Sequence, residues 1–405
     1  MKILVLRSSF QTDEFVQTEY SALIQQLQTE CAAEILIVGD QPMETLHAMS
    51  LPIPDAVMIA TGGVENLFKN ILETQFSAPI TLIADGRNNS LAAALEILTY
   101  LENNGLEGRI VHGTNDEIIA SLMETQSIAP LRGTRIGLFG HPSDWLIASN
   151  VDRDYLLEHH GVETLDIDLN RLIEQIKQIP QKEAVKVSQA IVKGAKAVKE
   201  PSCADMVEAA KAYLAIKKIC QEERLDAMTI RCFDIVKACG TTSCLALALL
   251  NDEGIVAGCE GDMQTLMTMV LAKRLCGEEA FMANPSTLTD NTSLLAHCTI
   301  PIKMCDAMTI RSHFESGIGV AIQGMLPLTD YTIFKWGGPQ LDRYFVAEAQ
   351  AIEAPYSDHF CRTQIMLNVN LKSYLLQHSI GNHHVIIRGR HANTLKRFFE
   401  AQCGK

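Results

Sequence analysis

The sequence lacks the short motifs of several common enzyme classes. It has 405 residues and twelve cysteines but no CxxC pair, so neither a zinc finger nor a thioredoxin-like redox centre is expected. No GxGxxG follows the first strand of either predicted α/β region, and no P-loop or nucleophile elbow occurs. Scattered cysteines in a chain of this size are typical of reduced thiols in the cytoplasm, not of a disulfide framework.

Basic residues and long apolar runs are also scarce. The chain carries 34 Lys and Arg against 48 Asp and Glu, a net charge of −14, which argues against nucleic acid and anionic membranes as partners. No segment approaches the roughly 20 apolar residues of a membrane helix. The N-terminal MKILVLRSSF is too short an apolar stretch for a signal peptide. We therefore expect a cytoplasmic protein with neither a nucleic-acid nor a membrane partner.

The sequence does have a large apolar fraction arranged in regular patterns. Hydrophobic residues make up 47% and charged residues 20%, enough for sizeable packed cores. In residues 1–130, apolar strands alternate with helical patterns, which predicts a parallel, doubly wound sheet. The expected strands are 2–6, 34–38, 56–60, 80–84 and 109–112, and the expected helices are 14–30 and 90–103.

Two further regions follow a connector at 125–134. Residues 131–290 open with an apolar strand at 135–140 and continue through strongly helical segments, which predicts a second α/β domain. In residues 291–405, short runs of alternating apolar and polar residues are separated by Gly, Pro and Asp, a pattern typical of an antiparallel barrel or sandwich. A terminal helix at 392–403 completes a predicted α/β chain of three domains.

Two acids mark the carboxyl end of a predicted strand in the second domain. The apolar run 254–257 leads into GCEGD (258–262), and an apolar helix pattern follows. Open α/β sheets bind their ligands at this edge. Glu260 is therefore the expected centre of the site, and Asp262 is expected to contact the substrate. The alternative interpretation of Glu260 is an acid that only stabilises the start of the helix.

The other predicted strands of this domain also end in polar residues. Ser143, Asp144 and Trp145 follow the first strand, and a tryptophan beside polar groups can stack on a sugar ring. The structural alternative is a helix capped by Ser143 or Asp144, with Trp145 packed against it. Arg231 ends the next strand and is expected in the same substrate cleft; a salt bridge at the strand end is its alternative.

Amide and imidazole groups end the apolar runs that follow. They are Asn284, His297, His383 and His384. Together with Glu260 they suit Mn²⁺, Mg²⁺ or Co²⁺, and thiolate-free coordination disfavours structural zinc. His383 and His384 are neighbours on an extended segment and face opposite ways, so at most one of them binds the metal directly. His297 and His384 are also expected to contact the substrate, and a buried core histidine is the alternative for His297.

His313 and Glu315 are a further polar pair, in the segment SHFES at 312–316. If this segment is extended, the two side chains share one face. They then either support the site from behind or bridge strands of the barrel, and we prefer the second interpretation.

Several segments resemble the L-fucose/L-arabinose isomerase-like superfamily. From residue 231 onward they are IRCFDIV, GIVAGCEGDMQTLMTM, FMANPS, NTSLLAHCTIP, SHFESGIGVAIQG and GNHHVIIRG. The earlier FGHPSDWLIASNVD resembles the start of that family's second domain. The similarity spans residues 135–390 approximately. Its motifs are specific for the superfamily but not for a substrate.

The resemblance implies two Rossmann-like domains followed by a β-rich, barrel-like domain, in a homo-oligomer that is commonly a trimer or hexamer. It also implies a Mn²⁺-type ion, with Glu260 as ligand and catalytic base and His383 as ligand. The family's second acidic position, a ligand and a catalytic group, falls on Asn284. This chain departs from the family there, because an amide can bind a metal but cannot serve as a general base. Sites in the family are built from adjoining subunits, so residues of the first domain are expected to complete a neighbour's cleft, namely Arg7, Gly62 and Asn88.

The family's chemistry sets the predicted function. Two carboxylates flank the C1–C2 unit of an open-chain aldose, and the metal stabilises a cis-enediolate. We therefore predict a metal-dependent aldose–ketose isomerase of a free, deoxy- or sulfo-sugar. Glu260 would be its principal base, and Asp262, His297 or a metal-bound water would carry the second proton. An epimerase or lyase on the same scaffold, and a non-catalytic sugar-binding protein, are the alternatives.

Overall fold

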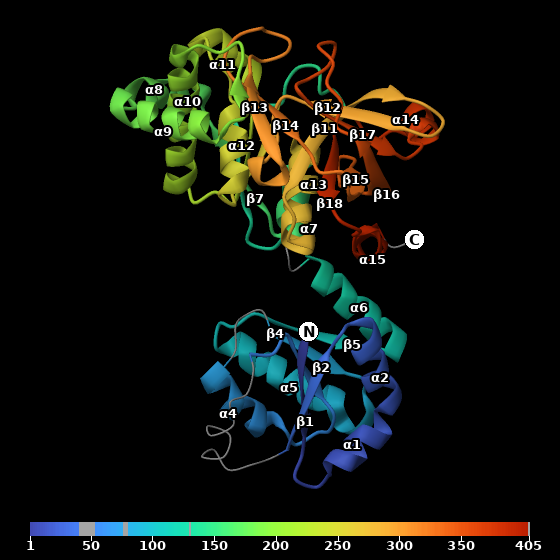
Figure 1. The fold of residues 1–405 in the computed structure, drawn as a ribbon. Helices are drawn as coiled ribbons and strands as arrows, with labels where there is room; N and C mark the ends of the chain where they lie inside the picture. The colour runs from blue at the N-terminus through green and yellow to red at the C-terminus, as the bar shows by residue number, and fades with distance from the viewer. Residues whose placement is uncertain (40–52, 76–79, 129–130, 404–405) are drawn as a thin grey trace. The chain divides into compact units, whose positions relative to one another are not determined.

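The computed structural model describes residues 1–39, 53–75, 80–128 and 131–403 of the chain (Figure 1). The chain forms two compact units, Met1–Ser127 and Ile128–Lys405. A further division of the second unit at residue 290 stays a prediction. Within the described residues, no helix combines the length and the apolar character needed to cross a membrane.

The first unit is a five-stranded parallel sheet with the strand order β2-β1-β3-β4-β5. Its strands are apolar because helices cover both faces of the sheet. The strands are β1 (Lys2–Arg7), β2 (Glu34–Gly39), β3 (Ala56–Ile59), β4 (Ile80–Ala84) and β5 (Gly108–His112). The helices are α1 (Asp13–Glu19), α2 (Ser21–Glu30), α4 (Glu65–Gln75), α5 (Ser90–Asn103) and α6 (Asn115–Ile128), with a 3₁₀ turn at Arg87–Asn89.

The single helix predicted at 14–30 is wrong, because Tyr20 divides it into α1 and α2. Tyr20 has non-helical backbone angles of φ −107° and ψ 16°. Its buried side chain donates a hydrogen bond to the carbonyl oxygen of Ala60, 2.5 Å away. The two residues are 40 positions apart in the chain, so the local sequence pattern does not predict the break.

The second unit begins with a four-stranded parallel sheet of order β10-β9-β6-β7. Its strands are β6 (Arg135–Phe139), β7 (Glu163–Ile167), β9 (Ala227–Ile230) and β10 (Val256–Cys259). Its helices are α7 (Arg153–His160), α8 (Leu169–Gln178), α9 (Gln181–Gly194), α10 (Cys203–Glu222), α11 (Cys232–Cys239), α12 (Cys244–Asp252) and α13 (Met263–Leu271), which continues as a π-helical turn at Ala272–Cys276. The helix after β6 is capped by Asp152, not by Ser143 or Asp144 as predicted.

Six antiparallel strands then close into a barrel, in the order β11-β12-β17-β16-β15-β18. Closure leaves the barrel no unpaired edge. Its strands are β11 (Ala280–Leu288), β12 (Ser293–His297), β15 (Asp330–Gly337), β16 (Arg343–Glu353), β17 (Thr363–Asn368) and β18 (His384–Arg388). The remaining helical elements are a 3₁₀ turn at Ile302–Met304, α14 (Lys372–Gln377) and α15 (Ala392–Cys403).

Two strands predicted within the β-rich domain lie outside the barrel. β13 (Ala307–Arg311) and β14 (Ala321–Met325) pair with each other and with β8 (Ala197–Val198) in a separate three-stranded sheet. The strands themselves were predictable from alternation, but their partner strand lies about a hundred residues earlier. The coarse fold prediction is confirmed: an α/β chain with parallel sheets followed by an antiparallel barrel.

Helix α13 joins the parallel sheet to the barrel. It contacts β9 and β10 on one side and β11, β15 and β18 on the other (Figure 1). One continuous apolar core therefore contains Met263 and Leu266 of the helix together with Phe334 and Val385 of the barrel. This packing brings the carboxyl end of β10 against the ends of barrel strands.

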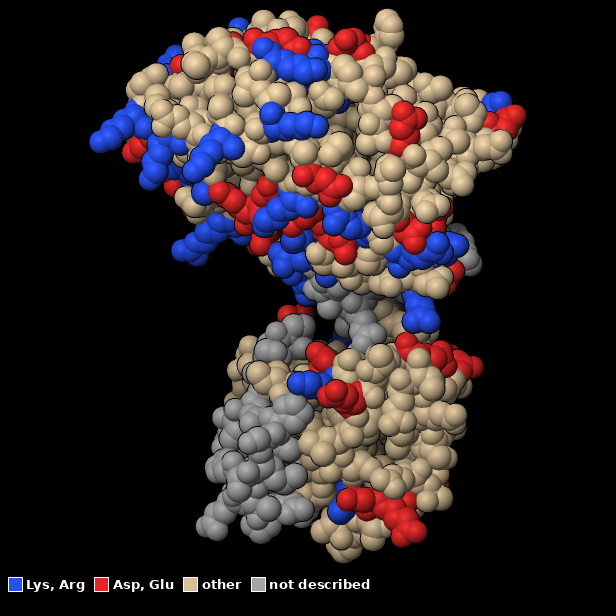
Figure 2. Space-filling view, in the orientation of Figure 1, with Lys and Arg blue, Asp and Glu red and all other residues tan. Residues whose placement is uncertain are grey.

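Charged side chains of both signs are interspersed over α8, α9 and α10 on the face shown in Figure 2. Arg171 of α8, for example, pairs with Glu222 and Glu223. Such exposed pairs contribute little to stability.

Candidate active site

Glu260 occupies a strained turn between β10 and α13. Its φ of +63° is left-handed, which is uncommon for a residue with a side chain. Gly261 follows with a φ of +75°, and Asp262 caps α13 by accepting a hydrogen bond from the backbone nitrogen of Thr265. The cap is therefore Asp262, and Glu260 is not an acid that merely starts the helix. Strain of this kind persists where the surrounding structure holds a functional group in place.

Gly261→Ala is expected to destabilise the second unit. An added Cβ would lie 2.7 Å from the Cα of Pro142 and 2.9 Å from the carbonyl oxygen of His141, both backbone atoms that cannot move aside. With the left-handed φ, we expect a loss of about 2–4 kcal/mol in the free energy of unfolding, measured by urea titration. Gly277→Ala is the matched control, because Gly277 has a φ of +72° but no atom within 4 Å of its Cβ position. Equal losses in the two variants would contradict this account of Gly261.

Three side chains converge at this turn. Glu260, His297 and His383 each offer a ligand atom, and these atoms lie within 4.8 Å of one another. The Oε1 atom of Glu260 is 3.5 Å from Nε2 of His383 and 3.9 Å from Nε2 of His297. Nε2 of His383 and Nδ1 of His297 are buried without a hydrogen-bond partner in the part of the chain that the structure describes. Of these two atoms, Nε2 of His383 is the one shown to face Glu260, and a buried ring nitrogen without a partner beside a carboxylate suits a cation.

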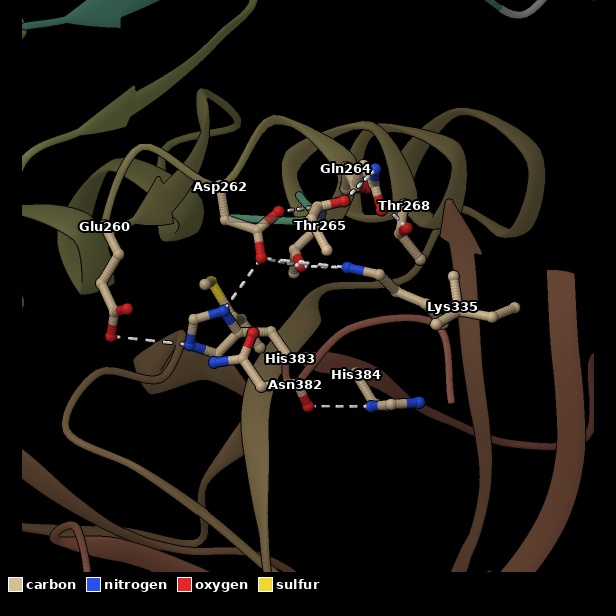
Figure 3. Close-up of polar contacts among 12 residues, drawn as sticks. Glu260, Asp262, Gln264, Thr265, Thr268, Lys335, Asn382, His383 and His384 are labelled. Carbon is tan, nitrogen blue, oxygen red and sulfur yellow. Dashed lines mark hydrogen bonds and ion pairs between the residues drawn. The ribbon is translucent and has the colours of Figure 1, made fainter. Parts of the chain in front are cut away.

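Asp262 orients His383 from behind (Figure 3). Its Oδ2 atom accepts a hydrogen bond from Nδ1 of His383 at 2.9 Å, and Nε2 of the same ring is directed at Glu260. Oδ2 also accepts from the hydroxyl of Thr265 at 2.6 Å and lies 3.8 Å from Nζ of Lys335. A carboxylate behind a histidine is the usual second layer of a metal site.

The cluster attracts positive charge. Burial opposes ionisation of Glu260, but His297 and His383 outweigh it, and its pKa lies below the ordinary value. Burial likewise opposes the charged form of His383, yet Asp262 and Glu260 raise its pKa to about 9. In the metal-free protein, Lys335 and protonated His383 supply positive charge beside the two carboxylates, and a bound divalent cation would take the place of the His383 proton. The donor set and the charge therefore both fit a divalent cation.

Comparisons with known proteins give relatives of low sequence identity. No family profile matches the chain. The sulfoquinovose isomerase of Clostridium sp. (strain MSTE9) is 24% identical over 272 residues, which cover 64% of this chain and 59% of the relative. The sulfoquinovose isomerase of Priestia aryabhattai is 23% identical, with 72% and 69% covered, and that of Alkalicoccus urumqiensis is 21% identical, with 77% and 74% covered.

The chain is thus similar to sulfoquinovose isomerases at low sequence identity, and it spans less than two thirds of the length of the Clostridium relative. Among solved structures, the maleate isomerase Iso from Pseudomonas putida S16 aligns with 56% of this chain and 94% of its own length, at 12% identity. Its TM-score of 0.16 is too low to bear on the fold or the function.

The loop after β6 contacts Glu260. The backbone nitrogen of Ser143 donates to the carbonyl oxygen of Glu260 at 2.9 Å. Nε1 of Trp145 donates to Oε2 of the same residue at 2.7 Å. Trp145 is 51% exposed, and its ring packs edge-on against Phe233. The indole thus both holds the carboxylate and offers an open face, while direct contact of Ser143 and Trp145 with substrate stays a prediction.

Arg231 holds this loop in place. Its guanidinium makes two hydrogen bonds to the carboxylate of Asp144, at 3.0 and 2.7 Å, and a third to the carbonyl oxygen of Pro142 at 2.7 Å. Its Nε atom donates to Asp234 at 2.7 Å. Asp234 lies in the first turn of α11. Roles for Arg231 and Asp144 in substrate binding stay predictions.

Asn284 and His384 lie next to the cluster in different ways. Asn284 is in β11, and its Oδ1 accepts a hydrogen bond from Nδ2 of Asn382, the residue before His383, at 3.1 Å. His384 points the opposite way from His383, as strand alternation requires, and its Nε2 is 2.9 Å from the hydroxyl of Tyr374 (Figure 3). Asn284 as metal ligand and catalytic group, and His384 in substrate binding, stay predictions.

His313 and Glu315 do not bridge strands of the barrel. They lie in a turn between β13 and β14, so the extended segment predicted there is wrong. The ring of His313 packs edge-on against Phe233 at 5.5 Å. Phe233 also contacts Trp145, so the turn that carries His313 and Glu315 is connected to the site.

The sequence did not single out Lys335 or Thr265, which support Asp262. Nζ of Lys335 is fully buried and donates to the hydroxyl of Thr265 at 2.5 Å. One signal was present: alternation along β15 puts Lys335 on the same face as the buried Tyr331 and Ile333. A lysine on a core face implies a buried acid opposite it.

Proposed function

We propose that this chain is a divalent-metal-dependent aldose–ketose isomerase that acts on a sulfo-sugar through a cis-enediolate. The observation that carries the proposal is the convergence of Glu260, His297 and His383 at the carboxyl end of β10, in a chain whose curated relatives are sulfoquinovose isomerases. Mn²⁺ is the expected ion, with Mg²⁺ and Co²⁺ as substitutes. We also infer that both parallel sheets are Rossmann-like, and that the protein is a cytoplasmic homo-oligomer, a trimer or hexamer, as the family resemblance implies.

Glu260, His297 and His383 would hold the metal, which when bound polarises the sugar carbonyl and stabilises the negative charge that develops on its oxygen. Glu260 is ionised, because the neighbouring imidazoles lower its pKa. The hydrogen bond from Trp145 fixes one of its oxygens, so the carboxylate is positioned to take the proton from C2. Asn284 contributes an amide, which can orient a hydroxyl but cannot move its proton.

An epimerase on the same scaffold is the second candidate, and Asn284 is the residue that favours it. Two carboxylates serve isomerisation by moving protons between both carbons and both oxygens. With an amide at 284, proton return to C2 from the opposite face becomes a competing outcome. Product analysis by NMR in D₂O separates the two reactions: an isomerase yields a ketose labelled at C1, and an epimerase yields an aldose labelled at C2.

The test uses metal-free protein and a panel of sulfoquinovose, deoxyhexoses and pentoses. We expect ketose to form from sulfoquinovose when Mn²⁺ is added and not when the metal is chelated. Conversion that is indifferent to chelation would overturn the metal's role. No conversion of any aldose with Mn²⁺, Mg²⁺ or Co²⁺ present would overturn the proposed function.

A further inference from the structure

Glu315 is an acid whose side chain forms no hydrogen bond or ion pair with the described residues. It lies in the turn between β13 and β14. Among the described residues, no hydrogen bond or ion pair engages its side chain, whereas other acids around the site are engaged, including Asp144, Asp234 and Asp262. A proton carrier must not be engaged in another salt bridge, must lie near the substrate and must exchange protons with solvent.

The turn that carries Glu315 is well defined. The backbone nitrogen of Gly317 donates to the carbonyl oxygen of His313 at 2.9 Å, and the nitrogen of His313 donates to Ile318 at 3.1 Å. The backbone nitrogen of Ser316 also donates to Nδ1 of His313 at 3.3 Å. These bonds close the loop on both sides of Glu315 and so restrict where its side chain can reach.

On its N-terminal side, the turn is connected to Glu260 through a series of side-chain contacts. The ring of His313 packs against Phe233 with centroids 5.5 Å apart, and Phe233 packs against Trp145 with centroids 5.1 Å apart. Trp145 in turn donates its hydrogen bond to Glu260. Three successive contacts therefore join the turn to the carboxylate at the centre of the site.

Phe314, the residue before Glu315, connects the turn to the surroundings of His297. Phe314 and Cys361 pack against a small buried cluster that contains Cys298, and Cys298 directly follows His297. Arg362 lies over the Phe314 ring at 5.8 Å. Glu315 is thus bracketed by two residues that contact the surroundings of Glu260 and of His297.

Electrostatics agree with this placement. Partial burial, and then the negative charge of Glu260, raise the pKa of Glu315 above its ordinary value. The pKa of the Cys361 thiol is raised by a hydrogen bond with Cys298, by burial and by negative charges that include Glu315. The charge of Glu260 therefore reaches Glu315 and favours its protonated form.

The other residues that could carry the second proton are less suitable. Oδ1 of Asp262 accepts from the backbone of Thr265, and Oδ2 accepts from Thr265 and His383, all inside a fully buried pocket. Asn284 has no ionisable group. His297 belongs to the group around Glu260 that suits a metal.

We propose that Glu315 is the second proton carrier of the isomerisation, an inference that rests on the proposed function. Glu260 takes the C2 proton, the C2–H electron pair becomes the C1–C2 π bond, and the carbonyl oxygen O1 receives the proton of Glu315. The O2 proton then passes to Glu315 as the C2 carbonyl forms, and Glu260 returns its proton to C1. Both carboxyl groups end as they began, so no co-reactant is needed.

The test compares Glu315→Gln with the unaltered protein on sulfoquinovose and Mn²⁺. We expect kcat to fall by about 10²–10⁴-fold, with KM and Mn²⁺ affinity within about threefold, because the residue is outside the metal cluster. The alkaline limb of the kcat–pH profile, which reports loss of the acid form, should disappear. Glu353→Gln, the same change at an exposed end of β16, is the control and should leave kcat unchanged.

Chemical rescue separates catalysis from structure. We expect formate to restore part of the activity of Glu315→Ala, because a small acid can enter the space that the side chain leaves. A Glu315→Gln variant with kcat within threefold of the unaltered protein would overturn this inference and leave the proposed function intact. So would an Ala variant that binds Mn²⁺ normally, is impaired and is not rescued. If the unaltered protein converts no aldose, the proposed function fails and this inference fails with it.

Discussion

Glu260→Gln is expected to lower kcat for ketose formation by at least about 10³-fold. The change keeps the shape of the side chain but removes both the negative charge and the ability to accept the C2 proton. The Oε1 atom lies 3.5 Å from Nε2 of His383, so the loss of charge also weakens the hold on the cation. Activity is measured at saturating Mn²⁺, which separates the loss of the base from the loss of affinity.

The control for this prediction is Glu222→Gln. Glu222 lies in α10 and pairs with Arg171 on the surface, so its replacement removes the same charge far from the turn. We expect that variant to retain full activity. If Glu260→Gln kept more than about a tenth of the activity with saturating metal, Glu260 would not be the principal base.

Asp262→Asn is expected to weaken Mn²⁺ binding by about 10–100-fold, the usual effect of removing the group that orients a histidine ligand. The same change leaves the ammonium of Lys335 buried with no counter-charge, since Asp262 is the acid 3.8 Å from its Nζ and both side chains are fully buried. Breaking a buried pair in this way costs about 3–5 kcal/mol. Metal titration followed by electron paramagnetic resonance gives the first quantity, and urea unfolding gives the second.

A second replacement separates these two effects. In Asp262→Asn combined with Lys335→Met, no buried charge is left unpaired, so most of the stability should return. Mn²⁺ affinity should remain low, because His383 still lacks its carboxylate. Recovery of both quantities together would mean that Asp262 acts on the metal site only through stability.

The sequence predicted those parts of the site that depend on local order along the chain. A strand end followed by glycine and acid placed Glu260 correctly, and alternation gave the opposite directions of His383 and His384. Asn284 and His297 were also predicted at ends of apolar runs, and both lie in barrel strands next to β18 or β17.

Features set by distant partners were not predictable in the same way. The helix predicted at 14–30 breaks where Tyr20 reaches Ala60, and β13 pairs with β8 rather than with the barrel. Lys335 and Asp262 are 73 positions apart in sequence (335 − 262) and meet only because α13 packs on β15. Periodicity shows which face of a strand is buried, but not which segment covers it.

Glu315 shows how a wrong local prediction can hide a functional group. Treated as part of an extended strand, it shared a face with His313 and was assigned to the barrel. In the structure the same residues form a turn closed by Gly317, and burial and then the charge of Glu260 raise the pKa of the acid. The chain's missing second acid, at 284, is what makes this position worth testing.

The most direct test of the account is a crystal structure of the protein soaked in Mn²⁺, with the ion located by its anomalous scattering. The account predicts one strong peak about 2.0–2.3 Å from a carboxylate oxygen of Glu260 and from a ring nitrogen each of His297 and His383, the usual range for such ligands. A fully occupied Mn²⁺ bound elsewhere, with no peak between these three side chains, would contradict it.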